Sequence, residues 1–257
     1  LPVDEMRAIV PAMVSGLKSG SSLPFAQAIM TTDSFPKIRS VACGDGTIVG
    51  IAKGAGMIEP NMATMLSFID TDLEVSRELL QRALAAAVAT TFNRISVDGD
   101  QSTSDMVLAV SSNRAGSCRE QELTRALRAV CAELAEDVVR NGEGTAHVVR
   151  VTVTGAAEEA TAVAFGKAVV NSPLVKTAIF GNDPNVGRII AAIGDFAGNN
   201  RISIDSNRLS VYLGSEPVFE RGAFVLDKEK EIRLSDYLKS TAMNPRLHGY
   251  PQHDEIV

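Results

Sequence analysis

Residues 53–68, KGAGMIEPNMATMLSF, are the part of the chain whose residue types best fit a chemical task. A lysine, two glycines, a Pro-Asn turn and a threonine stand just before an apolar run that is typical of a buried strand. Glycines let backbone amides approach a small molecule closely, and an activated threonine hydroxyl can act as a nucleophile. The same residues also fit a plain glycine-rich connection with a solvated lysine, so the segment by itself leaves both interpretations open.

Several common catalytic motifs are absent. The sequence contains no GxxxxGK[ST], HExxH or GxSxG pattern, which removes the usual marks of a P-loop, a zincin and a serine-hydrolase elbow. The glycines at 44, 46 and 50 have the wrong spacing for a dinucleotide loop and favour a hairpin turn. Residues 98–105, DGDQSTSD, resemble the start of a calcium loop, but Thr103 and Ala109 stand where that loop needs Gly and Glu.

The composition excludes other classes of function. Of the 257 residues, 25 are Lys or Arg and 31 are Asp or Glu, so the net charge is -6, with no basic block for nucleic-acid binding. No apolar run approaches the roughly 20 residues needed to cross a bilayer. Cys43, Cys118 and Cys131 show no CxxC spacing, which favours buried thiols in a reducing compartment. With only three histidines in addition, we expect no metal site.

Five segments together resemble the ornithine acetyltransferase family, the bifunctional glutamate N-acetyltransferases of arginine biosynthesis. They occur in the family's order and cover most of the chain: IMTTD (29–33), KGAGMIEPNMATMLSFI (53–69), FNRISVDGDQSTSD (92–105), GEGTA (142–146) and SPLVKTAIFGNDPNVGRIIAAIG (172–194). In combination these motifs are highly specific, and they outweigh the interpretation of residues 53–68 as a plain connection.

The resemblance implies that the precursor cuts itself between Ala63 and Thr64. In the family, the hydroxyl of this threonine attacks the preceding carbonyl, and water resolves the resulting ester. The new chain would begin with Thr64, whose free α-amine has an unperturbed pKa of about 7.7–8.0 and can serve as general base toward its own hydroxyl. Thr64 would thus be the catalytic nucleophile.

By the same resemblance, Thr64 takes the acetyl group from N2-acetylornithine, releases ornithine and passes the acetyl group to glutamate, with ping-pong kinetics. The positions that match the family's substrate-binding residues are Thr31, Lys53 and Glu143, with Thr32 as the adjacent alternative to Thr31. Lys53 offers a cation for an α-carboxylate, and Glu143 offers an anion for an amino group. We expect no cofactor, with acetyl-CoA as a possible co-substrate. The alternatives are an N-terminal-nucleophile aminopeptidase or amidase, and a non-catalytic relative.

The two ends of the chain depart from the family pattern. The family's oxyanion-hole Thr-Gly pair precedes the LP segment with which this sequence begins, and the family's tail with its Asn and Thr does not follow Val257. The N-terminus has no signal or transit peptide pattern and resembles the start of an internal fragment. We therefore expect both ends to be missing, which would remove donors that commonly contribute roughly 10²- to 10³-fold each in rate. Two smaller departures are His147, where Lys is more usual, and Val186, where Trp is common.

The elements that must position these residues are a mixture of helices and strands. Apolar periodicity predicts helices over residues 4–18, 22–30, 75–92, 158–171, 186–196 and 228–239, with Pro11 bending or breaking the first. A further helix carries the stripe Leu123, Leu127, Cys131, Leu134 and Val138 and ends at Asn141-Gly142. Thr71 or Asp72 is a candidate cap for the helix at 75–92. Strands are predicted over residues 37–43, 47–52, 64–70, 106–111 and 147–154, followed by short strands after residue 201.

This mixture, without strict βαβ alternation, predicts an α+β fold. The resemblance adds a layered αββα sandwich of the N-terminal-nucleophile type in residues 1–155 and a smaller, incomplete α/β domain in residues 156–257. It further implies that the processed α and β chains assemble as an α2β2 heterotetramer. The expected compartment is the cytoplasm, or the mitochondrial matrix in a eukaryote.

Overall fold

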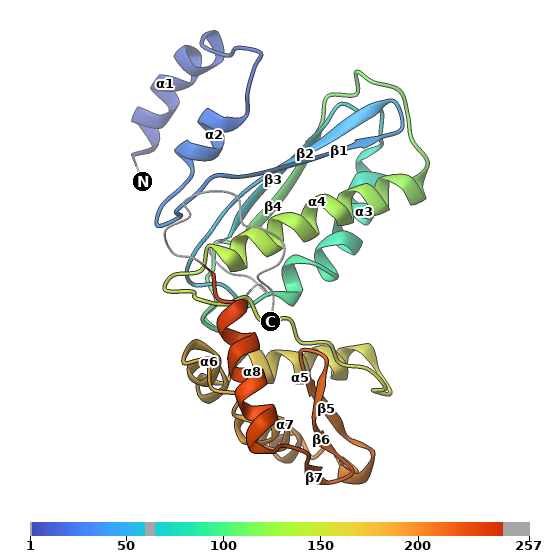
Figure 1. The fold of residues 1–257 in the computed structure, drawn as a ribbon. Helices are drawn as coiled ribbons and strands as arrows, with labels where there is room; N and C mark the ends of the chain where they lie inside the picture. Colours follow the sequence, from blue (N-terminus) through green and yellow to red (C-terminus); the bar gives the residue numbers. More distant parts are fainter. Residues whose placement is uncertain (1, 60–64, 244–257) are drawn as a thin grey trace.

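The computed structural model describes residues 2–59 and 65–243, and its main sheet has four strands in the order of the sequence. These are β1 (Lys37–Cys43), β2 (Gly46–Lys53), β3 (Leu66–Thr71) and β4 (Met106–Ser111). The first three strands run antiparallel to one another, and β4 is parallel to β3 (Figure 1). Ala63 and Thr64 lie outside the described residues, between β2 and β3 in the sequence.

The β1–β2 hairpin is the element that the glycine spacing predicted. The two strands are joined by Gly44 and Asp45, and Gly44 has a positive φ of 56° that favours glycine. Cys43 pairs with Gly46, so the loop has two residues. The prediction of a turn at this point, in place of a dinucleotide loop, is confirmed.

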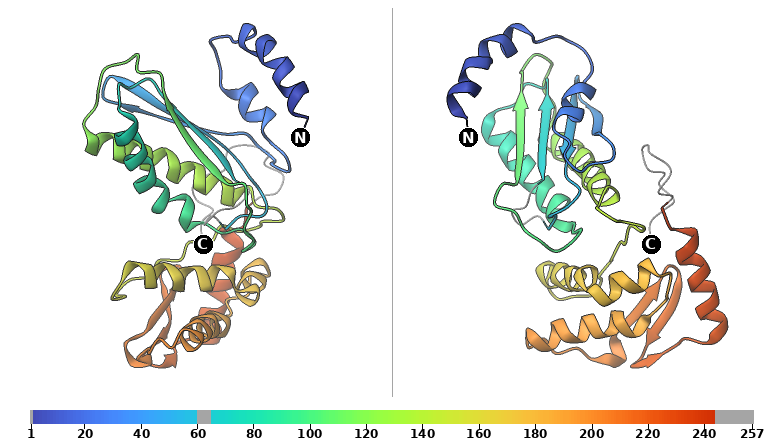
Figure 2. Two further views of the ribbon diagram at one scale, coloured as in Figure 1. Left: turned by 180° about the vertical axis from the view of Figure 1, so that it is seen from behind. Right: turned by 90° about the vertical axis from the view of Figure 1, so that its left-hand side faces the viewer.

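Two helices that run side by side in the same direction, α3 (Arg77–Ala89) and α4 (Glu120–Arg140), cover one face of this sheet (Figure 2). The predicted stripe of α4 is fully buried in the core. Both predicted caps of α3 are wrong, because Ser76 caps the helix by accepting the N–H of Leu79. The hydroxyl of Thr71 accepts from Leu73 and the carboxylate of Asp72 accepts from Thr47, so both side chains serve the strand ends.

The opposite face of the sheet is only partly covered. Helix α2 (Leu23–Ala28) packs there through Phe25, whose ring meets Phe68 edge-on at 5.1 Å between centroids. Helix α1 (Val3–Ser15) buries none of its residues and runs through Pro11 without interruption, so of the two predicted effects of that proline the break is wrong and the bend stays a prediction. A proline costs one backbone hydrogen bond but need not end a helix. The apolar side chains of β4 on this face are 39–48% exposed: Met106, Leu108 and Val110.

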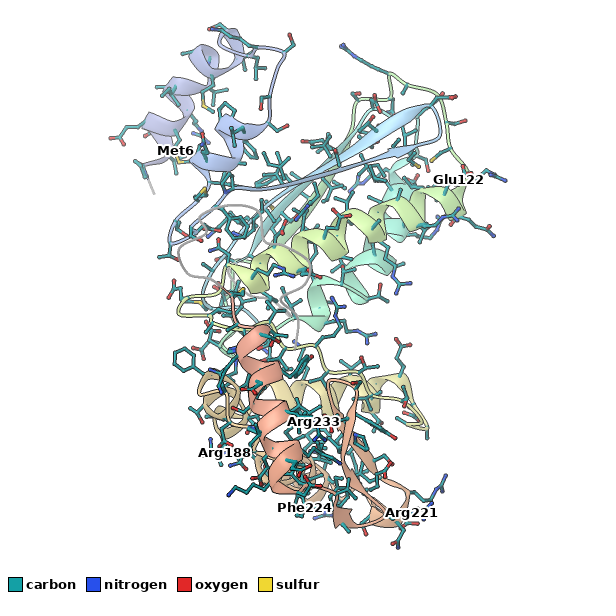
Figure 3. The ribbon with its side chains drawn as sticks, in the orientation of Figure 1. Met6, Glu122, Arg188, Arg221, Phe224 and Arg233 are labelled. Atoms are coloured by element: carbon teal, nitrogen blue, oxygen red, sulfur yellow. The ribbon has the colours of Figure 1, made fainter. Side chains whose placement is uncertain are left out.

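The remaining elements surround a second apolar core. They are the short 3-10 helix η2 (Ser206–Arg208), the helices α5 (Glu159–Asn171), α6 (Pro173–Phe180), α7 (Val186–Asn199) and α8 (Lys228–Ser240), and a sheet of β5 (Ser210–Leu213), β6 (Glu216–Glu220) and β7 (Ala223–Phe224). The short 3-10 helix η1 (Phe92–Arg94), which precedes β4, belongs instead to the first core through Phe92. Arg233 of α8 forms two hydrogen bonds with the carboxylate of Glu216 on β6, at 3.0 and 2.8 Å, and Figure 3 shows it on the helix beside this sheet. The α+β class is confirmed.

Two predicted elements of this half need correction. Residues 147–154 are not a strand, since only Val148 makes an isolated bridge. Their apolar alternation is that of a strand, but a strand also needs a neighbouring backbone to pair with. Helix α6 was missed, although Ser172 accepts the N–H of Val175 as a cap and Pro173 occupies the first turn, the usual signals of a helix start.

The two apolar cores have separate memberships. Val138 belongs to the first core, whereas Val149 and Val151 pack against the second. The chain therefore passes from the first core to the second within the segment that follows α4, and the domain boundary at residue 155 stays a prediction. Among the described residues, no helix is long and apolar enough to span a membrane.

Gly50 of β2 offers a test of how closely α4 packs on the sheet. A Cβ at this position would lie 2.5 Å from a Val130 methyl and 2.6 Å from a Leu134 methyl. Gly50→Ala should therefore lower the free energy of unfolding in urea by about 1–3 kcal/mol through overpacking. The control is Gly194→Ala in α7, where a Cβ meets nothing within 4 Å and the change should be neutral or stabilising by up to about 1 kcal/mol. Equal effects at both positions would contradict this account.

Candidate functional site

A fully buried lysine, Lys37, lies at the centre of the site. Its Nζ donates to Oδ1 of Asp33 at 2.5 Å and to Oδ1 of Asn141 at 2.6 Å, and it lies 5.0 Å from the centre of the Phe35 ring. An ammonium group without water is tolerated only when it is paired and hydrogen-bonded. The pair is therefore a fixed structural centre that joins β1 to the end of the Thr-Thr-Asp segment (31–33) and to the end of α4.

Asp33 and Asn141 extend this pair into a network of backbone contacts. Oδ1 of Asp33 also accepts the N–H of Gly54 at 2.8 Å, and Oδ2 accepts the N–H of Thr31 at 3.1 Å. The side chain of Asn141 accepts the N–H of Ser34 at 3.2 Å and donates to its hydroxyl at 2.7 Å. Three segments distant in sequence are thus held together, and each of them contains or adjoins one predicted substrate-binding residue.

Burial and charge act in opposite directions on this pair. Burial by itself would raise the pKa of Asp33, but the N–H of Gly54, the Lys37 ammonium and the N–H of Thr31 outweigh it and hold that pKa below its usual range. Burial lowers the pKa of Lys37, and Asp33 opposes that shift. Asp33 therefore stays ionised in the folded protein. Its contribution to stability is present above its ordinary pKa of 3.8 and is lost as the pH falls through the lower pKa of the folded state.

Glu143 reaches the glycine-rich segment from the end of α4. Its backbone N–H donates to the carbonyl of Ala55 at 2.9 Å, and its carboxylate lies beside Gly56, where a Cβ would approach it to 3.0 Å. Because Gly56 has no side chain, the Glu143 carboxylate can lie close to the backbone of the glycine-rich segment, as the glycines of this segment suggested. The hydroxyl of Thr32 donates to Oε1 of Glu143 at 2.6 Å.

The structure thus brings Thr32 and Glu143 into contact, and it places Lys53 at the end of β2 immediately before Gly54. The side chain of Lys53 is 8% exposed and makes no ion pair or hydrogen bond with other residues in the ranges 2–59 and 65–243. The contact of Thr31 in this region is that of its backbone N–H, so its role in binding stays a prediction.

The far side of the glycine-rich segment is held by Asp98, in the segment that follows η1. Its carboxylate accepts the N–H groups of Met57 at 2.6 Å and Ile58 at 2.9 Å. Met57 has a positive φ of 57°, a conformation that a non-glycine residue adopts at a cost and that these hydrogen bonds support. A cavity of 1140 Å³ opens here, lined by Asp98 and Glu143 together with residues of α4, α5 and α6.

Sequence reasoning missed the buried pair at the centre of this site. The spacing of Asp33 and Lys37 was visible, but a lysine four residues after an aspartate is usually a surface pair. Lys37 also stands at an alternating position of a predicted strand, which would have been a usable signal, because charged residues rarely take the buried positions of a strand.

Comparison with known proteins shows the family of the chain. Residues 1–248 match the model of the ArgJ family. The chain belongs to the ArgJ family. The resemblance inferred from the sequence motifs is confirmed, since the ornithine acetyltransferases are this family.

Two curated relatives carry the name arginine biosynthesis bifunctional protein ArgJ. The protein of Syntrophotalea carbinolica is 43% identical over 93% of this chain and 62% of its own length, and that of Wolinella succinogenes is 44% identical over 93% and 60%. This ArgJ-family chain therefore spans about three fifths of the length of these relatives. The crystal structure of the Bacillus halodurans protein of the same name has a TM-score of 0.62 at 37% identity, over 68% of this chain and 83% of that one.

Lys37→Met tests whether the buried pair holds the site together. Removing the ammonium leaves Asp33 buried without its counter-charge, which should lower the free energy of unfolding by about 3–5 kcal/mol. Lys239→Met is the matched control, because Lys239 pairs with Asp236 at 3.0 Å with both side chains at least 60% exposed. That exposed pair should contribute less than about 1 kcal/mol in the same denaturant titration. A similar small loss for both variants would show that the Asp33–Lys37 pair is not a structural centre.

Proposed function

We propose that this chain is the main part of a self-processing acetyltransferase that moves the acetyl group of N2-acetylornithine to glutamate. The observation that supports it best is the arrangement around residues 54–58. Glu143 and Thr32 contact each other on one side of this segment, Lys53 precedes it, and residue 64 follows it closely in the sequence. The names of the curated relatives, which place those proteins in arginine biosynthesis, support the same reaction.

Thr64 acts twice in the proposed mechanism. First its Oγ attacks the carbonyl carbon of Ala63, the Ala63–Thr64 amide bond breaks, and an ester forms while the nitrogen becomes the free α-amine of Thr64. Water then hydrolyses the ester, leaving Ala63 as a carboxylate end and Thr64 as a new N-terminus. In the second role the α-amine takes the proton from the same hydroxyl, which attacks the acetyl carbonyl of N2-acetylornithine and releases ornithine.

The second half-reaction reverses this sequence with another amine. The amino group of glutamate attacks the acetyl ester on Thr64, and N-acetylglutamate leaves while the hydroxyl regains its proton. Both acetyl donor and acceptor are α-amino acids or their acetyl derivatives, so one recognition site suits both. Lys53 binds the α-carboxylate, and Glu143 binds the amino group of the ornithine side chain.

Processing would leave two chains that stay paired. Strand β2 ends ten residues before the proposed cut, and β3 begins two residues after it. These strands pair from Ile48↔Thr71 to Lys53↔Leu66, so the sheet itself would hold the α chain to the β chain. We propose that two such pairs form an α2β2 assembly in the cytoplasm, or in the mitochondrial matrix of a eukaryote, and that acetyl-CoA serves as an additional acetyl donor without a bound cofactor.

The self-cleavage step is tested by the mass of the denatured complete protein. We expect two polypeptides that part after Ala63, and Thr64→Ala should abolish both the cut and acetyl exchange, because no hydroxyl remains to attack. Thr64→Ser keeps a hydroxyl at the same atom and should still be cut. An unsplit protein with full acetyl exchange would exclude this mechanism.

The rival reaction, hydrolysis by the same nucleophile, differs only in the acceptor. Supplying the acetylated enzyme with increasing glutamate should convert acetate release into N-acetylglutamate formation. If water still outcompetes saturating glutamate, the protein is an aminopeptidase or amidase.

Glu143 and Lys53 are expected to act in binding. Glu143→Gln removes the anion that faces the amino group, and the loss of a charge-assisted hydrogen bond should raise KM for N2-acetylornithine by about 10- to 100-fold. Lys53→Met should raise KM for both N2-acetylornithine and glutamate, because both have an α-carboxylate. Glu158→Gln, at an exposed position before α5, is the control and should leave KM unchanged.

The same assay separates the two threonines. Thr32→Val should impair binding if the hydroxyl that contacts Glu143 also orients it, and Thr31→Val should impair binding if the family position is the functional one. Unchanged KM values in Glu143→Gln and Lys53→Met would contradict the proposed binding site.

A further inference from the structure

The hairpin loop at Gly44 and Asp45 packs against the segment that leads into α4. A Cβ on Gly44 would lie 2.9 Å from the Cβ of Cys118. A Cβ on Gly116 would lie 2.6 Å from Oδ2 of Asp45. The two glycines permit these close approaches, which place Cys118 directly beside the end of β1, where Cys43 precedes Gly44.

Cys43 and Cys118 contact each other through their thiols. Both are free cysteines, and a hydrogen bond joins their side chains. Cys43 is 5% exposed and belongs to the first core, whereas Cys118 is half-buried and packs against that core. Two thiols in contact, one of them within reach of solvent, are the starting arrangement for a disulfide bond.

The two thiols differ in their readiness to react. Burial, contact with Cys118 and the carboxylate of Glu122 raise the pKa of Cys43 to about 12, and Arg125 opposes this shift. Glu122 lies near the start of α4 (Figure 3). Cys43 therefore stays a protonated thiol at neutral pH, and the half-buried Cys118 is the residue that an oxidant can reach first.

We infer that Cys43 and Cys118 are a modification site, at which a low-molecular-weight disulfide converts the two thiols into a reversible disulfide bond. The thiolate of Cys118 attacks one sulfur of this oxidant, which forms a mixed disulfide and releases one thiol. The sulfur of Cys43 then attacks Sγ of Cys118 and gives up its proton, and the second thiol leaves. Two S–H bonds are thus replaced by one Sγ–Sγ bond, and the oxidant is reduced to two thiols. In a reducing compartment the reverse exchange returns the pair to thiols.

The positions of the two cysteines in the sequence give this bond a consequence that rests on the proposed function. Cys43 precedes the proposed cut between Ala63 and Thr64, and Cys118 follows it. The disulfide therefore joins the α chain to the β chain covalently and replaces the connection that processing removes. The bond itself does not depend on processing, since the contact between the thiols is present in the continuous chain.

The bond lies far from the proposed binding residues. Cys43 and Lys37 stand at opposite ends of the seven residues of β1. At about 3.4 Å per residue, this strand separates them by about 20 Å. Lys53 likewise lies at the end of β2 that is remote from the hairpin loop. The link therefore joins the two chains at the end of the sheet opposite to the site.

Treatment of the complete, processed protein with oxidised glutathione tests the inference. After alkylation and denaturation without reductant, the main species should contain both polypeptides in one molecule, and dithiothreitol should separate them. Cys118→Ala should give separate chains after the same treatment. Cys131→Ala is the matched control, because it removes a fully buried thiol of α4, and its chains should still be joined. Joined chains in Cys118→Ala, or separate chains in Cys131→Ala, would overturn the inference.

A peptide map of the oxidised wild-type protein needs no variant. Digestion without reductant should release two peptides joined by a disulfide, with Cys43 in one and Cys118 in the other. An unsplit protein that yields this pair would contradict the proposed self-cleavage and support the disulfide. Separate peptides, in which Cys43 and Cys118 are each alkylated, would overturn the disulfide even in a split and active protein.

Discussion

The ion pair between Lys37 and Asp33 is the interaction on which the site depends. The Lys37 side chain has no exposed surface, and it is stable there because its ammonium donates hydrogen bonds to Asp33 and Asn141. The cost of removing this charge from water is offset by hydrogen bonds that do more than neutralise it. Through Asp33 and Asn141 the pair determines where the Thr31–Ser34 segment, Gly54 and the end of α4 lie relative to one another.

Carboxylates recur as the anchors of irregular backbone in this molecule. Asp33 binds Gly54, Asp98 binds Met57 and Ile58, and Asp105 binds Met65. These contacts flank residues 60–64 on both sides and come from three different parts of the sequence. Each replaces the backbone partners that a loop cannot obtain from a sheet, which allows irregular backbone to be held at defined positions.

The parts of the fold that follow from local pattern could be predicted from the sequence. The stripe of α4 and the hairpin at Gly44 have periods or turn residues that depend on few distant contacts, and the alternating strand at residues 106–111 finds its pairing partner in β3. Residues 147–154 show the opposite case, because their alternation needs a pairing partner that no local pattern reports. The family motifs identified Lys53 and Glu143 as candidates, but the contact of Glu143 with Thr32 and the burial of Lys37 depend on tertiary packing.

The connection between β2 and β3 has a consequence for how the chain tolerates being opened. The described pairing of these strands runs to Lys53 and Leu66, and it involves none of residues 54–59. A break in that connection would remove a covalent tether and leave all the described pairs between β2 and β3 in place. The new chain ends would gain conformational entropy from such a break. The six paired positions of β2 and β3 would still keep the two polypeptides in register, as in a protein assembled from complementary fragments.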